Sequence, residues 1–295
     1  MLKRAILSAA FFFLAGMNLS YALDWKSLHE RADKINLSAA LKEARARPES
    51  RDDLYILGLV YLNLHRDKEA GEAFGQVLRL EPETAEAKWG LSEVLRRQHQ
   101  PKKSEQLLAE VFKSIPDFPP ALITLAYIEY IRMDFNRAVR LANQVLKQSE
   151  KGVDISNRVR AYLLYGGTKG MIAHYGGPLS KLVNGTAVLP NLKAAEKLQP
   201  DSAGVKFGLG SFYFLAPGLA GGDPQRAEEY LKRAIALDPL FADAYVRLAQ
   251  FYQMKDDSAR YNEYLNQALK IDPGNELALD IKSGRCKFIC PARDR

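Results

Sequence analysis

The sequence predicts an all-α protein built as a stack of helix pairs, an α-solenoid, interrupted by two insertions. Prolines recur at intervals of 34 residues, at Pro48, Pro82 and Pro116 and again at Pro239 and Pro273. Between these prolines, small and large apolar residues recur in one register. The interval widens in the middle of the chain. A fixed period of this length is typical of repeat proteins, whose units are stable only when stacked.

The first complete unit contains the most regular motif. It reads LxxLGxxY from Leu54 and AxxxF from Ala70, and it ends at Pro82. This pattern resembles the tetratricopeptide repeat in nearly every anchor, with leucine where the family has its first tryptophan. The small residues let the two helices of a unit approach closely, and the large ones fill the seam at helical spacing.

Further copies of the motif begin at Leu91, Leu125, Leu209 and Tyr245, and the third unit ends in Glu150 where proline is expected. The resemblance implies a right-handed superhelix of about five to six units over residues 23–274, with a concave groove. Residues 275–295 are expected to form a capping helix and a tail that contains two cysteines.

The spacing of the unit ends locates two insertions. From Glu150 to Pro200 is 50 residues, 16 more than one unit, and from Pro200 to Pro239 is 39, five more. The first insertion falls near 166–190, where paired glycines are expected to bound a helical segment. The second falls near 215–223, in the apolar sequence LAPGLAGGD. Long loops in compact proteins are often functional, but surface insertions are also tolerated, so both interpretations stay open.

The glycines that precede Asp223 raise the alternative of a phosphate site at a helix N-terminus. No lysine with serine or threonine follows them in the Walker arrangement. Asp223 is placed to cap a helix and Pro224 suits a first helical turn, so we expect a scaffold corner here.

The first 22 residues have the features of a secretory signal peptide cleaved after Ala22. Lys3 and Arg4 precede an apolar run of 13 residues that ends at Met17. A retained membrane anchor is the alternative, although a spanning helix needs about 20 residues. No cysteine lies near the cleavage site, which disfavours a lipid anchor. We therefore expect an exported, periplasmic protein.

Charge and cysteine content constrain the partners. Cleavage lowers the formal net charge from +7 to +5, because Lys3 and Arg4 leave and no acidic residue does. Basic and acidic residues alternate along most of the chain, which disfavours nucleic-acid binding and leaves proximity to a membrane surface open. Cys286 and Cys290 are expected to form a disulfide in an oxidising compartment; free or intermolecular thiols and half of a zinc site are the alternatives.

No pattern supports catalysis, a metal site or a cofactor. The four histidines, His29, His65, His99 and His174, stand apart in the sequence, and no GxSxG motif occurs. We therefore expect a non-enzymatic protein.

The family resemblance assigns the concave wall to the first helix of each unit. Mapped onto this chain, that face selects a largely aromatic and apolar set: Tyr55, Leu59, Leu62, Trp89, Glu93, Arg96, Ile123, Tyr127, Tyr130, Phe207, Ser211 and Phe214. These residues either bind a partner or ligand or simply pack the superhelix, and Tyr127, Tyr130 and Phe207 are the strongest candidates for binding.

The sequence favours an interaction adaptor that binds a partner peptide or helix in the groove, within an envelope assembly, export or transport complex. The alternative is a component of a transport system that binds a small molecule or lipid-like ligand, with the two insertions closed over the aromatic residues.

Overall fold

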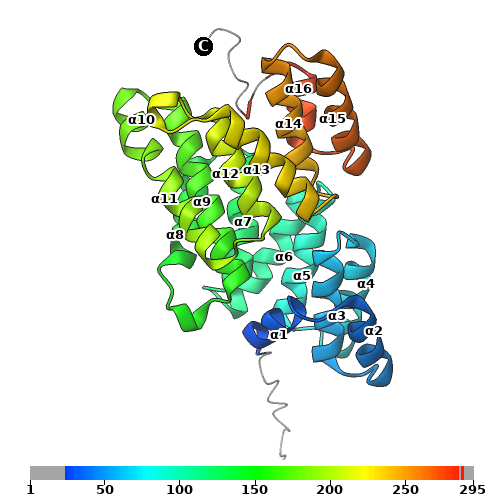
Figure 1. Ribbon diagram of the computed structural model, residues 1–295. Coiled ribbons are helices and arrows are strands. Elements are labelled where there is room, and N and C mark those ends of the chain that lie inside the picture. Colours follow the sequence, from blue (N-terminus) through cyan, green and yellow to red (C-terminus); the bar gives the residue numbers. More distant parts are fainter. Residues whose placement is uncertain (1–23, 286, 289–295) are drawn as a thin grey trace, which may run out of the picture.

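The computed structural model describes residues 24–285 and 287–288, and within these residues every regular element is a helix. The helices form the predicted α-solenoid (Figure 1). The predicted signal peptide, residues 1–22, and both cysteines, Cys286 and Cys290, lie outside the described residues.

Within residues 24–285, six helix pairs make up the solenoid, each with its two helices packed together. The pairs are α3 (Arg51–Asn63) with α4 (Asp67–Leu80), α5 (Ala85–Arg97) with α6 (Pro101–Ser114), α7 (Pro119–Ile131) with α8 (Phe135–Leu146), α9 (Ile155–Tyr175) with α11 (Val188–Leu198), α12 (Ala203–Leu215) with α13 (Pro224–Leu237), and α14 (Ala242–Met254) with α15 (Ser258–Ile271).

Short helices lie at both ends of the stack. Helices α1 (Trp25–Ala32) and α2 (Leu37–Ala46) precede the pairs, and both pack on α3. The segment expected to cap the C-terminal end forms α16 (Glu276–Lys282), which packs on α14 and α15.

The packing of one phenylalanine, Phe74, explains why glycine is required at two positions of the repeat motif. A β-carbon at Gly58 on α3 would lie 2.6 Å from the Phe74 ring, and one at Gly90 on α5 would lie 2.7 Å from the same ring. Phe74 on α4 is fully buried between these two first helices. Close packing of adjacent units therefore depends on the missing side chains at both positions.

The glycine-rich corner at residues 221–223 is a helix start, as predicted. The Asp223 carboxylate accepts hydrogen bonds from the backbone N–H groups of Gln225 and Arg226, at 3.0 and 3.1 Å, and Pro224 lies in the first turn of α13. Gly221 takes a left-handed conformation, with φ of 96°.

The first insertion differs from the expected arrangement, because the glycine pair Gly166–Gly167 does not end a helix. Helix α9, which is 21 residues long, continues through this glycine pair. Gly176–Gly177 separates α9 from the additional helix α10 (Pro178–Gly185). A β-carbon at Gly166 would lie 3.3 Å from the Val188 carbonyl oxygen, so this glycine lets α11 pack closely on α9.

The solenoid curves until its two ends meet. His65 and His99, in the turns between the helices of the first two pairs, contact Asp238 and Asp272 near the C-terminal end. Helix α1 likewise reaches α9, where Asn157 Nδ2 lies 3.2 Å from His29 Nδ1. Figure 1 shows α14 to α16 beside and above the N-terminal pairs. The concave side is therefore bordered by helices from both ends of the described chain.

Candidate ligand-binding cavity

The curved helices surround a cavity of about 1880 Å³ that is partly open to solvent. Its wall comes mainly from first helices of the pairs, α5, α7, α9, α12 and α14, with α10 and α16 adding further residues. Most of the lining is apolar. A volume well above the range of about 300–1,000 Å³ usual for ligand sites can hold an elongated or lipid-sized molecule.

Both insertions line this one cavity. Helix α10 contributes Lys181 and Leu182, and the second insertion contributes residues 215–220 and 222. In the second insertion a short 3₁₀ turn, Gly218–Ala220, leaves the Leu219 side chain fully exposed. Two segments that break the repeat at separate places in the sequence are thus brought together by the fold.

Aromatic rings from the first helices α7 and α12, with Phe241 just before α14, form much of the apolar wall. Tyr127 and Tyr130 on α7 lie 6.4 Å apart, centroid to centroid. Phe207 on α12 contacts Phe241 at 5.0 Å, and both line the cavity. Such rings supply broad apolar contact surface at little cost in conformational entropy.

The structure divides the sequence-predicted groove residues into two sets. Those that line the cavity are Leu62, Glu93, Arg96, Ile123, Tyr127, Tyr130, Phe207, Ser211 and Phe214. Tyr55, Leu59 and Trp89 do not line it; they are buried in the core of the N-terminal pairs.

The N-terminal part of the groove is filled by α1, which the repeat pattern does not include. The Tyr55 hydroxyl lies 2.9 Å from His29 Nε2, and Trp25 packs edge-on against Phe118 at 5.2 Å. The Trp89 ring lies 5.2 Å from His29 and donates its N–H to Thr124 Oγ1 at 3.0 Å. Tyr55, Leu59 and Trp89 therefore pack the superhelix, the alternative that the sequence left open, and do not line the cavity.

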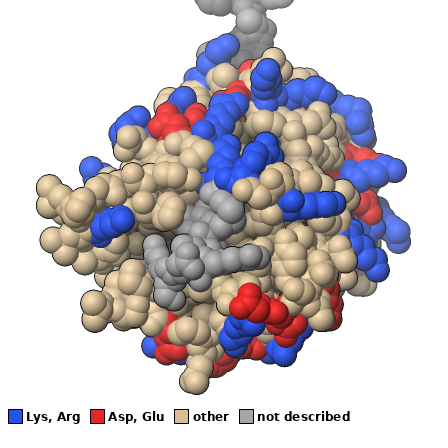
Figure 2. Space-filling model, turned by 90° about the horizontal axis from the view of Figure 1, so that it is seen from above, with Lys and Arg blue, Asp and Glu red and all other residues tan. Residues whose placement is uncertain are grey.

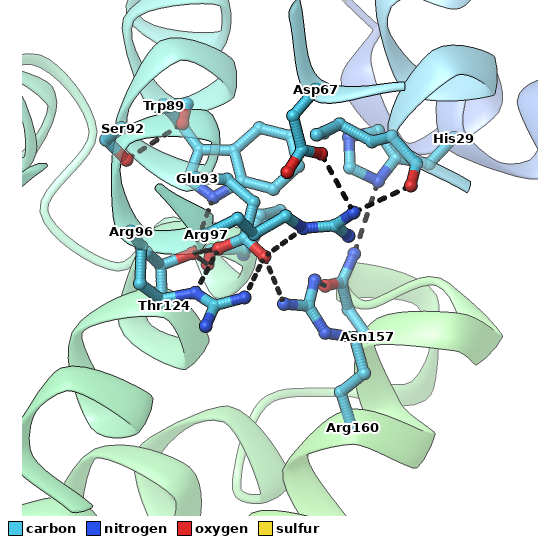
Figure 3. Close-up of polar contacts among 12 residues, drawn as sticks. His29, Asp67, Trp89, Ser92, Glu93, Arg96, Arg97, Thr124, Asn157 and Arg160 are labelled. Carbon is cyan, nitrogen blue, oxygen red and sulfur yellow. Dashed lines mark hydrogen bonds and ion pairs between the residues drawn. The ribbon is translucent and has the colours of Figure 1, made fainter. Parts of the chain in front are cut away.

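A buried carboxylate, Glu93, organises one part of the wall (Figure 3). It accepts hydrogen bonds from Arg96 at 2.8 and 3.0 Å, from Arg97 at 3.3 Å and from Arg160 at 3.3 Å. Burial alone would raise the pKa of Glu93, but the charges of Arg96 and Arg160 hold it well below its usual range. Glu93 therefore remains ionised and fixes three guanidinium groups from α5 and α9.

The guanidinium groups of this cluster also contact the aromatic wall. Arg96 lies over the Tyr127 ring, 4.3 Å from its centroid. Arg97 also pairs with Asp67 at 3.3 Å and donates to the Leu62 carbonyl oxygen at 2.7 Å. The sequence pattern missed Arg160, because it lies on α9, where the repeat motif is not recognisable.

Where the N-terminal pairs meet the C-terminal part of the solenoid, acidic side chains contact histidines. His65 Nε2 lies 2.8 Å from Asp238, and His99 contacts both Asp272 and Glu276 at 2.9 Å. The hydrogen bonds to Asp272 and Glu276 raise the pKa of His99 to about 10. His99 is thus a cation at neutral pH.

The described residues contain no group of three or more His, Cys, Asp or Glu side chains suited to holding a metal ion. None of the helices in the described part of the chain is both long and apolar enough to cross a membrane.

Comparison with known proteins agrees with this architecture. The family model described as Tetratricopeptide repeat matches residues 57–117, and the one described as TRAP transporter T-component matches residues 192–283. The second match runs from α11 to α16 and includes the second insertion. The sequence matches no curated protein.

Solved structures share the fold at low sequence identity. A tetratricopeptide repeat protein from Parabacteroides merdae superposes with a TM-score of 0.52 at 14% identity, covering 88% of this chain and 93% of that chain. The APC/C hetero-tetramer Cut9-Hcn1 gives a TM-score of 0.58 at 16% identity, covering 89% of this chain and 48% of that one. Human IFIT1 with PPP-AAAA gives 0.57 at 16% identity, covering 88% and 58%. This chain thus spans about half the length of the last two.

Helix pairs, motif register and structural likeness lead to the same conclusion. The fold is a repeat scaffold of the kind that supports protein–protein interaction and is typically non-enzymatic. Residues 57–117 match the tetratricopeptide repeat, and the chain shares the α-solenoid fold of tetratricopeptide repeat proteins.

Proposed function

We propose that this protein is an envelope component of a solute transport system that holds an apolar ligand inside the solenoid. The observation that carries the proposal is the meeting of both insertions on one large, mainly apolar cavity. Insertions gathered on one face of a repeat protein commonly build its binding surface. The match to the TRAP transporter T-component family over residues 192–283 supports the association with transport.

The form of the cavity favours a ligand over an open protein-binding groove. The contacts of His65 with Asp238 and of His99 with Asp272 hold the N-terminal pairs against the C-terminal part of the solenoid, so both parts border the cavity. The wall offers the aromatic residues Tyr127, Tyr130 and Phe207 to an apolar body. The outer surface of the repeats remains available for a protein partner within the transport complex.

The place of action follows from the N-terminal sequence. We propose cleavage after Ala22 and a periplasmic location for the mature chain, with Cys286 and Cys290 joined in that oxidising compartment.

A second candidate function is the interaction adaptor, in which a segment of a partner protein enters the cavity. The exposed apolar side chains Leu179, Leu182 and Val183 on α10, with Leu219 on the second insertion, favour this candidate. In Figure 2 the side of the face that carries α10, at the left, is largely uncharged. Exposed apolar patches of this kind often mark protein contacts.

Native mass spectrometry of the mature chain, residues 23–295, purified gently from the envelope fraction, tests both candidates. The matched variant combines Tyr127→Ala with Phe207→Ala, and Leu80→Ala, an exposed side chain on α4 away from the cavity, serves as the control. A small mass retained by the wild type and the control but lost from the double variant supports the ligand carrier. A co-purifying protein lost in the same way supports the adaptor, and equal retention in all three variants contradicts the assignment of the cavity.

A further inference from the structure

We infer that the ligand is an amphiphilic organic acid whose carboxylate binds Arg247. This inference rests on the proposed function, since it names the chemical class of the molecule in the cavity.

Arg247 is a buried cation with an incomplete set of partners. It lies on α14, is only 6% exposed and lines the cavity. Its one hydrogen bond to the described residues runs from Nη1 to Gln250 Oε1, at 2.7 Å, and Nε is buried without a partner. An ionised group removed from water without compensating bonds is costly.

The carboxylates around Arg247 are committed to other groups. Asp243, one turn earlier on α14, accepts from Asn275 Nδ2 at 2.6 Å and forms no ion pair with Arg247. Asp272 and Glu276 both contact His99. Among the described residues, no acidic side chain lies within ion-pair distance of Arg247. The edge of its guanidinium formed by Nε and Nη2 is thus left for a group that the described residues do not provide.

The repeat register shows that a charge at this position is unusual within the chain. Arg247 stands eight residues after Pro239. It is the sixth residue of its first helix, and the sixth residues of four other first helices are uncharged: Ile56, Gly90, Thr124 and Gly208. The remaining first helix, α9, has Arg160 there, but Arg160 pairs with Glu93. A scaffold position that breaks its own pattern without a structural partner points to function.

The surroundings of Arg247 suit the rest of such a ligand. Burial lowers the pKa of Arg247, while the neighbouring Tyr130 and Asp243 act in the opposite direction. Tyr130 lines the cavity beside Tyr127. Ser211, also on the wall, has a buried hydroxyl oxygen without a partner.

The geometry of guanidinium favours a carboxylate. Two parallel N–H groups on one edge match the two oxygens of a planar carboxylate, and these charge-assisted bonds are stronger than bonds to a neutral hydroxyl. An apolar chain attached to that carboxylate can then lie along the aromatic wall.

Competition binding separates the acid from its neutral analogue. The fluorophore N-phenyl-1-naphthylamine, which is neutral and apolar, is bound to lipid-free residues 23–295 and displaced with dodecanoate or with 1-dodecanol. We expect the wild type to bind dodecanoate about 10- to 100-fold more tightly than the alcohol, the range that a charge-assisted hydrogen bond supports.

Two variants and one control locate the effect. Arg247→Gln should bring the acid-to-alcohol ratio of affinities close to one, and Arg247→Lys, which keeps the charge but not the two-pronged edge, should lower it severalfold. Arg233→Gln, an exposed residue on α13 that pairs with Asp201 away from the cavity, should keep the wild-type ratio. Circular dichroism reports whether each variant is folded.

The outcomes distinguish the inference from the proposed function. If the wild type binds neither fluorophore nor alcohol, the proposed ligand-carrier function is wrong. If it binds the fluorophore but binds acid and alcohol equally, only the inference about the acid fails. If Arg247→Gln keeps the wild-type ratio of acid to alcohol affinities, the assignment of the carboxylate to Arg247 is wrong. If the glutamine variant does not fold, an unchanged ratio in Arg247→Lys leads to the same conclusion.

Discussion

His99 Nε2 lies 2.9 Å from the Asp272 carboxylate, and His65 Nε2 lies 2.8 Å from the Asp238 carboxylate. His65 precedes His99 by 34 residues, and Asp238 precedes Asp272 by the same number. The same histidine–aspartate contact is therefore made in two successive repeats. Both histidines take a left-handed backbone conformation, with φ of 56° and 58°, at the turn after a first helix. Gly274 permits the second contact, since a β-carbon there would lie 2.4 Å from the His99 ring.

The first prediction concerns pH. The pKa of His99 rises from 6.5 to about 10 in the folded protein, because Asp272 and Glu276 accept hydrogen bonds from its ring. A pKa raised by folding gives stabilisation that is complete below pH 6.5 and disappears as the pH rises through 10. The difference in melting temperature between wild type and His99→Gln should therefore shrink between pH 6.5 and pH 10, as followed by circular dichroism.

At low pH, the Asp272 carboxylate makes stability depend on pH in the opposite direction. The pKa of Asp272 is lowered overall, because the His99 contact outweighs the effect of burial. This part of the stabilisation is lost as the pH falls through the folded-state pKa of Asp272. A melting-temperature difference that stays constant from pH 6.5 to pH 10 would show that the His99 contact does not link protonation to folding.

The second prediction concerns Glu93. Replacing it with glutamine leaves Arg96, Arg97 and Arg160 without their shared anion in a buried site. Removing one member of a buried ion pair costs about 3–5 kcal/mol, so we expect the free energy of unfolding in urea to fall by about 3 kcal/mol. Glu110→Gln is the control, since its pair with Lys88 is solvent-exposed on the glutamate side and such pairs contribute about 1 kcal/mol or less. Equal losses in the two variants would contradict the role given to Glu93.

The third prediction concerns the seam between the first two units. Gly90→Ala places a β-carbon 2.7 Å from the Phe74 ring, and overpacking of this kind costs about 1–3 kcal/mol. Combining it with Phe74→Leu should cost less than the sum of the single changes, with a coupling of about 1 kcal/mol. Gly75→Ala on α4, which meets only the end of the Arg79 side chain at 3.7 Å, should be neutral or stabilising. Strict additivity in denaturant unfolding would mean that Phe74 is not what requires the glycine.

The repeat itself could be predicted from the sequence because its determinants are local. The anchors around Gly58 and Phe74 repeat at a fixed spacing, and the Asp223–Pro224 corner follows from helix-capping chemistry. The α9 pair escaped recognition because it packs through Gly166 against the backbone of Val188, a contact outside the repeat pattern.

The cavity could not be predicted from the sequence, because its formation depends on the curvature of the solenoid. Small rotations between successive units add up over the solenoid, and only their sum brings His99 to Asp272. Tyr55 and Trp89 were assigned to the groove because the family pattern leaves that groove open, whereas here His29 on α1 covers them. Arg247 shares its place in the first helix with only one other charged residue, Arg160, and that Arg247 lacks an acidic partner among the described residues is evident only in the structure.

The last prediction tests the second insertion by removing it. Deleting Ala216 to Ala220 restores the interval from Pro200 to Pro239 to 34 residues, since 39 − 5 = 34. It leaves Gly221, Gly222 and Asp223 between α12 and α13, the same length as the three residues 255–257 that join α14 to α15. Asp223 still caps α13 through Gln225 and Arg226.

We therefore expect the deletion variant to fold with unchanged helicity, because shortening an exposed loop changes the closure entropy by only about 1 kcal/mol or less. Its affinity for N-phenyl-1-naphthylamine should fall about tenfold, since a wall segment that includes the exposed Leu219 is gone and about 1.4 kcal/mol of binding energy corresponds to that factor. Fluorescence titration against the wild type measures the change. Wild-type affinity in a folded deletion variant would make the insertion a tolerated surface loop, whereas a loss of affinity with intact helicity makes it part of the site and explains why the repeat is broken there.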